Sequence, residues 1–160
     1  MYIRLIWFKL VFFYTKSIIF FENKKDMKNF DKWNEEKKKI DSLKYENFYV
    51  NVREIYFTKM WINIGFEQDW KKDFLRPVLI IKRIWILIFC IPLSTKFKDN
   101  LFYKKLETCI FYKNKYIKEN SMLILSQWKT LDTKRFIKQI WYISKLEFEE
   151  LKKILKNMYF

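Results

Sequence analysis

The 160-residue sequence contains no histidine. This absence excludes general acid–base catalysis by imidazole and every metal site that needs a histidine ligand. The two cysteines, Cys90 and Cys109, do not form a CxxC pair, and Cys90 lies in an apolar run typical of a small buried hydrophobe. The sequence therefore shows neither a secreted disulfide scaffold nor a paired-cysteine metal motif.

Acidic residues are few relative to basic ones. There are 18 Asp and Glu against 33 Lys and Arg, which gives a formal net charge of +15. Such a balance favours a polyanionic partner, either nucleic acid or an anionic membrane surface. AT-rich coding also enriches a protein in lysine, so the charge alone does not establish RNA binding. The chain length is that of one domain with an appendage.

Residues 1–26 differ in composition from the rest of the chain, because the first 21 are mostly aromatic and branched aliphatic. That length suits a transmembrane helix. However, Lys9 near its centre would cost about 2.5–3.5 kcal/mol on insertion, and the segment has no small-residue cleavage site. Three interpretations stay open: upstream in-frame translation before a native start at Met27, an amphipathic or membrane anchor, and an extra packed element.

The remaining chain predicts a helix, then strands, then a second helix. Apolar residues on one face predict the first helix over residues 29–43. Apolar and β-branched runs then predict strands over residues 54–60, 77–81, 84–91, 100–106 and 122–129. Asp132 is expected to cap a short helix over 133–137, and Ser144 with Glu147 forms a capping box. The last helix carries an apolar stripe of Phe148, Leu151, Leu155 and Met158.

Three kinds of side chain suited to phosphodiester cleavage follow one another in the middle of the chain. Glu67 lies in the polar loop 65–74, Arg76 precedes Pro77 at a strand start, and Ser94 and Thr95 follow the next apolar run. RNA cleavage requires deprotonation of the 2′-hydroxyl, stabilisation of the phosphorane charge and protonation of the 5′-oxygen. A carboxylate, a guanidinium and a hydroxyl can perform these steps without a metal or a histidine.

The order and spacing of these residues resemble the PemK/MazF family of toxin endoribonucleases. In that family a loop carrying Glu-Gln leads to Arg-Pro at the start of a buried strand, and the next strand ends in Pro-x-Thr-Ser or Pro-x-Thr-Thr. The corresponding residues here are Glu67-Gln68, Arg76-Pro77 and Pro92-Leu93-Ser94-Thr95. The likeness continues through residues 121–127 and 132–136. It implies a mainly β (α+β) fold, a small SH3-like barrel of the PemK/MazF/CcdB toxin type with an N-terminal and a C-terminal helix.

The resemblance also implies roles for individual residues. Arg76 takes the place of the catalytic arginine, Ser94 that of the catalytic threonine, and Glu67 that of an acidic residue in the first loop. RNA contacts are expected from Gln68, Thr95, Lys96, Gln127 and Arg135. Ser126 stands where an aspartate often precedes the family's glutamine. A simpler interpretation also stays open, in which Arg76 forms a surface salt bridge with Glu67 or Asp73, and Ser94 and Thr95 are turn residues that cap a strand end.

The implied function is that of the toxin of a type II toxin–antitoxin system, a metal-independent endoribonuclease that cleaves single-stranded RNA without a cofactor. RNA, a cognate antitoxin and a second copy of the chain are the implied partners, in the cytoplasm. The alternative is a catalytically impaired relative that binds nucleic acid or antitoxin.

We predict three segments: an extension at 1–26, a helix and linker at 27–52, and a barrel with its C-terminal helix at 53–160. Membrane association would require that residues 1–26 are genuinely expressed.

Glycine is nearly absent, with 1 residue against 7 tryptophans, whereas ordinary usage would make about 7% of residues glycine. Related PemK-like sequences commonly carry glycine at the positions of Trp61, Trp70 and Trp141, and Trp85 and Trp128 are similar candidates. UGA codons, which some bacterial lineages read as glycine, would explain this pattern if they had been translated as tryptophan. The alternative is that these are true tryptophans that pack on the barrel surface.

Overall fold

The computed structural model describes residues 30–45, 48–60, 74–107, 110–112, 115–117 and 121–160. The chain divides into two compact units, Met1–Phe30 and Asp31–Phe160. Only Phe30 of the first unit is described, so the fold given below is that of the second unit. The interpretations offered for residues 1–26 lie outside the described residues, and the division into three segments stays a prediction.

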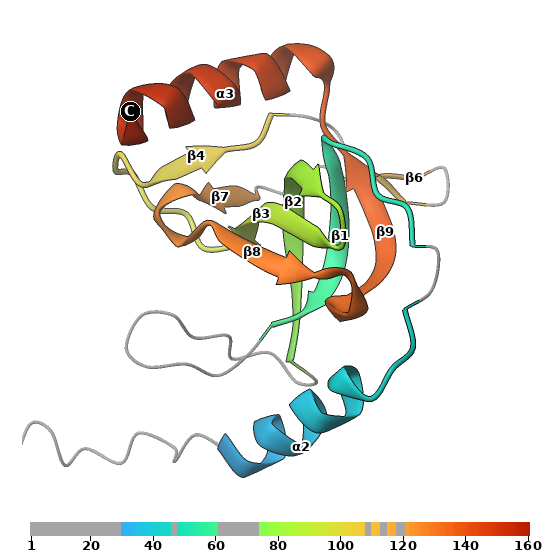
Figure 1. The fold of residues 1–160 in the computed structure, drawn as a ribbon. Coiled ribbons are helices and arrows are strands. Elements are labelled where there is room, and N and C mark those ends of the chain that lie inside the picture. Colours follow the sequence, from blue (N-terminus) through green and yellow to red (C-terminus); the bar gives the residue numbers. More distant parts are fainter. Residues whose placement is uncertain (1–29, 46–47, 61–73, 108–109, 113–114, 118–120) are drawn as a thin grey trace, which may run out of the picture. The chain divides into compact units, whose positions relative to one another are not determined.

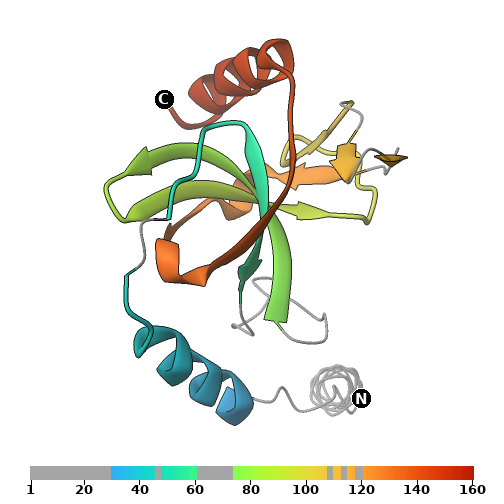
Figure 2. The same ribbon diagram turned by 90° about the vertical axis from the view of Figure 1, so that its right-hand side faces the viewer.

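Within the described residues, seven strands form one antiparallel sheet, which curves strongly (Figures 1 and 2). The path across this sheet runs β4–β7–β3–β2–β1–β9, and β8 also pairs with β3. A separate two-stranded sheet is formed by β5 (Ile110–Tyr112) and β6 (Lys115–Ile117). The strands of the large sheet are β1 (Glu54–Lys59), β2 (Leu75–Ile84), β3 (Leu87–Ser94), β4 (Tyr103–Lys105), β7 (Met122–Ile124), β8 (Lys129–Asp132) and β9 (Phe136–Tyr142).

Strand β3 lies between β2 on one edge and both β8 and β7 on the other. Its first half pairs with β8, up to Cys90 opposite Lys129, and its end pairs with β7, where Ser94 lies opposite Met122. The short 3-10 helix η2 (Leu125–Gln127) separates β7 from β8 in the sequence. Together β7, η2 and β8 therefore form one bent segment along a single edge of β3.

Successive residues of β2 and β3 are buried on opposite faces of the sheet. Val78 and Ile80 belong to one hydrophobic cluster, whereas Leu79 and Ile91 belong to the other, and all four are 0% exposed. Because both faces are covered, these strands are continuous apolar runs rather than alternating ones. This explains why the sequence shows them clearly.

Helix α3 (Lys145–Tyr159) covers one of these clusters. The hydroxyl of Ser144 accepts a hydrogen bond from the backbone N–H of Glu147 at 3.1 Å, which confirms the Ser144 half of the predicted capping box. Phe148 and Leu151 are buried in the cluster, and the rest of the apolar stripe packs against it. The predicted C-terminal helix and its buried face are therefore confirmed.

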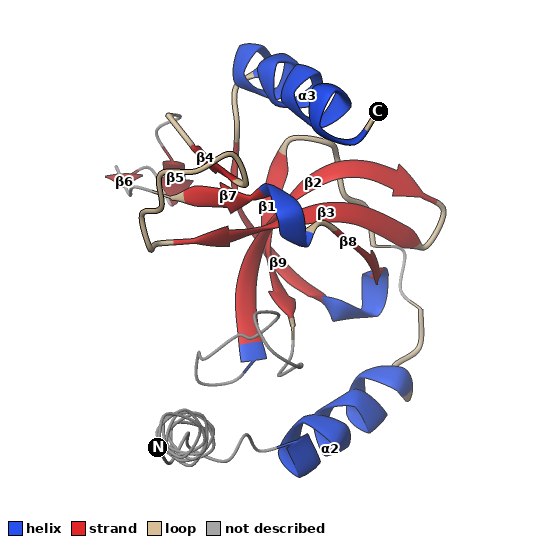
Figure 3. Cartoon of the chain, turned by 90° about the vertical axis from the view of Figure 1, so that its left-hand side faces the viewer, coloured by secondary structure: helices blue, strands red, loops and turns tan. Residues whose placement is uncertain are grey.

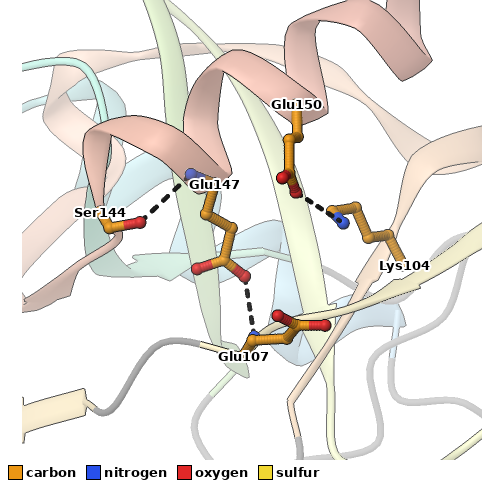
Figure 4. Close-up of polar contacts among 5 residues, drawn as sticks. All are labelled: Lys104, Glu107, Ser144, Glu147 and Glu150. Atoms are coloured by element: carbon orange, nitrogen blue, oxygen red, sulfur yellow. Dashed lines mark hydrogen bonds and ion pairs between the residues drawn. The ribbon is translucent and has the colours of Figure 1, made fainter.

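Polar contacts also attach α3 to β4 and to the segment that follows it (Figure 4). The buried carboxylate of Glu147 accepts a hydrogen bond from the backbone N–H of Glu107 at 2.8 Å. One turn further along α3, Glu150 lies 3.9 Å from the ammonium of Lys104. Because Glu150 is largely exposed, we expect this ion pair to contribute little to stability.

Helix α2 (Phe30–Asp41) agrees with the helix predicted over residues 29–43. Trp33 is the buried residue of this helix, and its ring lies 5.1 Å from that of Phe74. Glu36 also forms an ion pair of 2.8 Å with Lys59 at the end of β1. No helix within the described ranges is long and apolar enough to cross a lipid bilayer.

Several predicted boundaries were wrong. The turn between β2 and β3 lies at residues 85–86, inside the run predicted as a strand over 84–91. The strands predicted over 100–106 and 122–129 shorten to β4 and β7. Asp132 does accept a hydrogen bond from the N–H of Lys134 at 2.8 Å, but the helix it caps, η3 (Thr133–Arg135), ends two residues early because β9 begins at Phe136.

Candidate functional site

Arg76 lies near the start of β2, where its side chain reaches toward the end of β3. Its Nε–H donates a hydrogen bond to the backbone carbonyl of Leu93 at 3.2 Å. The register of the two strands pairs Val78 with Pro92, so continuing it by two residues brings Arg76 opposite Ser94. The structure therefore places the predicted guanidinium beside the residue that precedes the predicted hydroxyl.

A buried hydroxyl on the neighbouring strand supports this position of Arg76. Thr58 of β1 is paired with Arg76, is 0% exposed, and donates from Oγ1 to the carbonyl of Arg76 at 3.1 Å. Sequence reasoning missed Thr58, because nothing in a strand sequence shows which residue of another strand it will oppose. The bond holds the backbone of Arg76 from the edge opposite β3.

Ser94 ends β3 and is partly exposed. Its Oγ accepts a hydrogen bond from the backbone N–H of Lys96 at 3.1 Å, which turns the chain away from the sheet. This bond uses an acceptor lone pair of the hydroxyl, and the O–H proton can be donated to another group. Ser94 thus acts as the turn residue that the simpler interpretation expected, and it keeps the donor that the catalytic interpretation requires.

Thr95 and Lys96 follow Ser94 in the loop between β3 and β4, and both are exposed. They therefore lie within a few residues of the Arg76–Leu93 contact. On the other side of β3, Gln127 is the last residue of η2 and is partly buried. Because η2 lies between the segments that pair with Cys90 and with Leu93, Gln127 belongs to the same end of β3.

Arg135 occupies a different environment, beneath helix α2. Its Nη1 donates to the carbonyl of Lys59 at 3.3 Å, and its guanidinium carbon lies 5.7 Å from the centre of the Trp33 ring. Burial lowers the pKa of Arg135, while the charge of Asp132 opposes that change. Arg135 also borders a cavity of about 410 Å³ whose other wall includes Lys37 of α2. Its role in RNA binding stays a prediction.

Two of the predicted site residues, Glu67 and Gln68, lie outside the described residues. The same holds for Asp73, one of the two suggested salt-bridge partners of Arg76. Cys90, by contrast, lies in β3 close to the site, and it is not a nucleophile there. It is 0% exposed, and burial raises the pKa of its thiol to about 12, so the thiolate is scarcely populated at neutral pH.

A curved antiparallel sheet, flanked by an N-terminal and a C-terminal helix, gives this chain the fold of the MazF-like toxins. Among solved structures, it is similar to the Mycobacterium tuberculosis toxin MazF-mt6, with a TM-score of 0.50 and 15% sequence identity. The match covers 67% of this chain and 96% of the toxin. No family model matches the sequence, and no curated protein matches it. The predicted fold class is therefore confirmed by structure.

Proposed function

We propose that the chain is the toxin of a type II toxin–antitoxin system and that it cleaves single-stranded RNA as a metal-independent endoribonuclease. The observation that carries this proposal is the hydrogen bond between Arg76 and the carbonyl of Leu93, directly before Ser94. It holds the side chain of Arg76 against the backbone of the residue that precedes Ser94, and this supports a shared role for the two residues. The MazF-like fold supports the same conclusion.

The chemistry follows from the groups that meet at the end of β3. When a 2′-oxygen attacks the adjacent phosphorus, negative charge grows on the phosphoryl oxygens, and the guanidinium of Arg76 is suited to stabilise it. As the bond between phosphorus and the 5′-oxygen breaks, the hydroxyl of Ser94 is suited to donate a proton to the leaving 5′-oxygen, and water then restores the hydroxyl. Glu67 is proposed to accept the proton of the 2′-hydroxyl. The products would be a 2′,3′-cyclic phosphate and a 5′-hydroxyl.

The proposed partners follow from the same likeness. They are RNA, a cognate antitoxin that blocks the RNA site, and a second copy of the chain, all in the cytoplasm. The net charge of +15 favours a polyanionic substrate, and it predicts RNA binding that weakens as the salt concentration rises.

The test uses the full chain, a mixed-sequence RNA and EDTA. We expect defined cuts with cyclic-phosphate ends from the native sequence and none from Arg76→Ala. Arg83→Ala is the matched control, because Arg83 lies on the same strand and donates from Nε to a backbone carbonyl, that of Trp85, at the far end of β2. Equal cleavage by the Arg76 and Arg83 variants would refute the proposal.

One observation favours a second function. Ser126 is exposed in η2, at the position where the family often carries an aspartate before the glutamine. A chain without that carboxylate could bind RNA or an antitoxin at the same surface without cleaving RNA. In that case a folded native chain would bind RNA and leave it intact in the assay above.

A further inference from the structure

The loop that leaves the candidate site exposes three large apolar side chains. Between Ser94 and β4, Phe97 is 66% exposed, Leu101 83% and Phe102 52%. Single exposed apolar residues are normal on protein surfaces, but three within six residues are harder to explain by chance. This loop, residues 95–102, is called here the β3–β4 loop (Figure 3).

Hydrogen bonds that involve backbone groups fix the β3–β4 loop at both of its ends. At its start, the N–H of Lys96 is bound by the Ser94 hydroxyl. At its end, the side chain of Asn100 accepts a hydrogen bond from the N–H of Phe102 at 3.0 Å. The carbonyl of Phe102 in turn accepts from the N–H of Leu125, the first residue of η2, at 2.8 Å. Phe102 is thus held beside the element that carries Gln127.

The same loop carries positive charge around its aromatic residues. Lys96 and Lys98 flank Phe97 and are exposed, and the ammonium of Lys98 lies 5.1 Å from the centre of the Tyr103 ring. Asp99 is the acidic residue of the loop. Aromatic rings between lysines are the arrangement with which proteins bind single-stranded nucleic acid, since the rings stack on bases and the lysines attract phosphates.

We propose that the β3–β4 loop is a platform on which unpaired RNA bases stack beside the scissile phosphate. Phe97 is the main stacking residue, Phe102 a second one, and Lys96 and Lys98 contact the adjoining phosphates. The inference rests on the proposed function, because it takes single-stranded RNA as the ligand. It adds a binding surface that recognises bases without reading their sequence, since every base presents an aromatic face.

The continuity of the loop with the candidate site favours RNA over another occupant. The loop begins at the residue after Ser94, so a strand whose phosphate contacts Arg76 and Ser94 would lie next to the first residues of the loop. The local charge is also complementary to RNA, with two lysines against one aspartate. The alternative, in which a protein partner covers the same residues, is distinguished by the experiment below.

The experiment measures the affinity of the full chain for a fluorescent 2′-fluoro RNA oligonucleotide, which has no 2′-hydroxyl to attack its own phosphate. The variants are Phe97→Ala, Phe97→Tyr and the control Phe160→Ala, whose side chain is fully exposed at the end of the chain. A second oligonucleotide of the same length carries abasic sites. We expect Phe97→Ala to weaken binding of the first on the order of tenfold. Phe97→Tyr and Phe160→Ala should bind like the native chain.

The abasic oligonucleotide separates stacking from other effects. If Phe97 stacks on bases, the native chain and Phe97→Ala bind the abasic strand equally. If Phe97→Ala loses affinity equally for both oligonucleotides, or for neither, the stacking proposal is overturned. A changed oligomeric state of Phe97→Ala, with unchanged RNA affinity, also overturns it and assigns the loop to a protein contact. Failure of the folded native chain to bind or cleave RNA defeats the proposed function itself.

Discussion

Arg76 and Leu93 are joined by a hydrogen bond from a side chain to the main chain, at 3.2 Å between Nε and the carbonyl oxygen. The acceptor belongs to the backbone, so it persists whatever side chain stands at position 93. Thr58 holds the backbone of Arg76 from the other side, through a buried hydroxyl. The guanidinium is thus positioned by the sheet itself, which is the preorganisation that electrostatic catalysis requires.

Replacing Arg76 by lysine should show whether the planar guanidinium is needed. Lysine keeps the charge but lacks the fork that binds a phosphate through two N–H groups. We expect kcat for RNA cleavage to fall about 10²–10³-fold, the usual cost of losing one charge-stabilising donor. Single-turnover cleavage measures this step, and Arg83→Lys is the matched control. An Arg76→Lys variant as active as the native chain would contradict the bidentate role.

Variants of Ser94 separate its turn role from its catalytic role. Ser94→Ala removes the acceptor for the Lys96 N–H as well as the hydroxyl proton, so both roles are lost. Ser94→Thr keeps the hydroxyl and adds the methyl group that the family carries. We expect cleavage to fall at least tenfold in the alanine variant and to stay near native or rise in the threonine variant. If both variants lose activity equally, the side chain at 94 acts through packing instead.

The turn between β2 and β3 tests the hypothesis that tryptophan stands at positions where the native protein has glycine. Ile84 pairs with Leu87, so Trp85 and Ile86 form a two-residue turn. Trp85 has a φ of 57° and its side chain is 80% exposed, whereas Ile86 has no positive φ. A turn with positive φ at its first central residue alone is a type II′ turn, which takes glycine there.

Trp85→Gly should therefore raise the free energy of unfolding by about 1 kcal/mol, since it relieves a strained backbone conformation. Trp85→Ala is the control, because it removes the exposed indole but keeps Cβ, and it should change stability by less than about 0.5 kcal/mol. Urea denaturation measures both. A glycine variant less stable than the alanine variant would contradict the proposed turn strain.

Trp141 behaves differently from Trp85 under the same hypothesis. Its side chain is 9% exposed and belongs to the hydrophobic cluster beneath α3, although its buried indole N–H has no hydrogen-bond partner. The burial of Trp141 favours a true tryptophan that packs in the core, while its unsatisfied N–H favours a smaller native residue at this position. Trp61 and Trp70 lie outside the described residues. The codons at these positions, UGA or UGG, decide the matter for each one.

Alkaline pH should destabilise the fold through two buried groups. Burial raises the pKa of the Cys90 thiol to about 12 from 9.0, and burial with nearby Glu54 raises the pKa of Tyr56 to about 12 from 10.0. Above about pH 9 the unfolded chain loses these protons while the folded chain retains them. The unfolded state then binds fewer protons, so the free energy of unfolding falls as pH rises from about 9 to 12.

The measurement is the midpoint of urea unfolding across that pH range. Cys90→Ala should flatten the decline that begins near pH 9, because the thiol no longer has to stay protonated. A native chain whose midpoint stays constant from pH 9 to 12 would show that neither group titrates as described. The same burial predicts that Cys90 reacts with thiol reagents only in denaturant.

Sequence reasoning found the elements whose signals lie within their own residues. The β2 and β3 runs are apolar because both faces of the sheet are covered, and Asp132 and Ser144 cap helical turns through their own side chains. It missed β9, because Lys138 and Gln139 interrupt the apolar pattern of that strand. It also missed the β2–β3 turn, since tryptophan and isoleucine carry no turn signal.

The sequence predicts candidate site residues by their chemical type, but it could not predict their geometry. The motifs around Arg76 and Ser94 identified two side chains that the structure brings to one strand end. Which backbone group would hold Arg76 depends on strand register, and a sequence does not state register. Arg135 was predicted among the RNA contacts, yet its packing against Trp33 depends on a helix that is distant in sequence.

The bent segment β7–η2–β8 limits how this chain can vary in length. Both of its ends pair with β3, so adding or removing one residue between 124 and 129 would shift one half by a residue and turn its buried side chains outward. Over evolution, residues 125–128 should therefore change by substitution rather than by insertion or deletion.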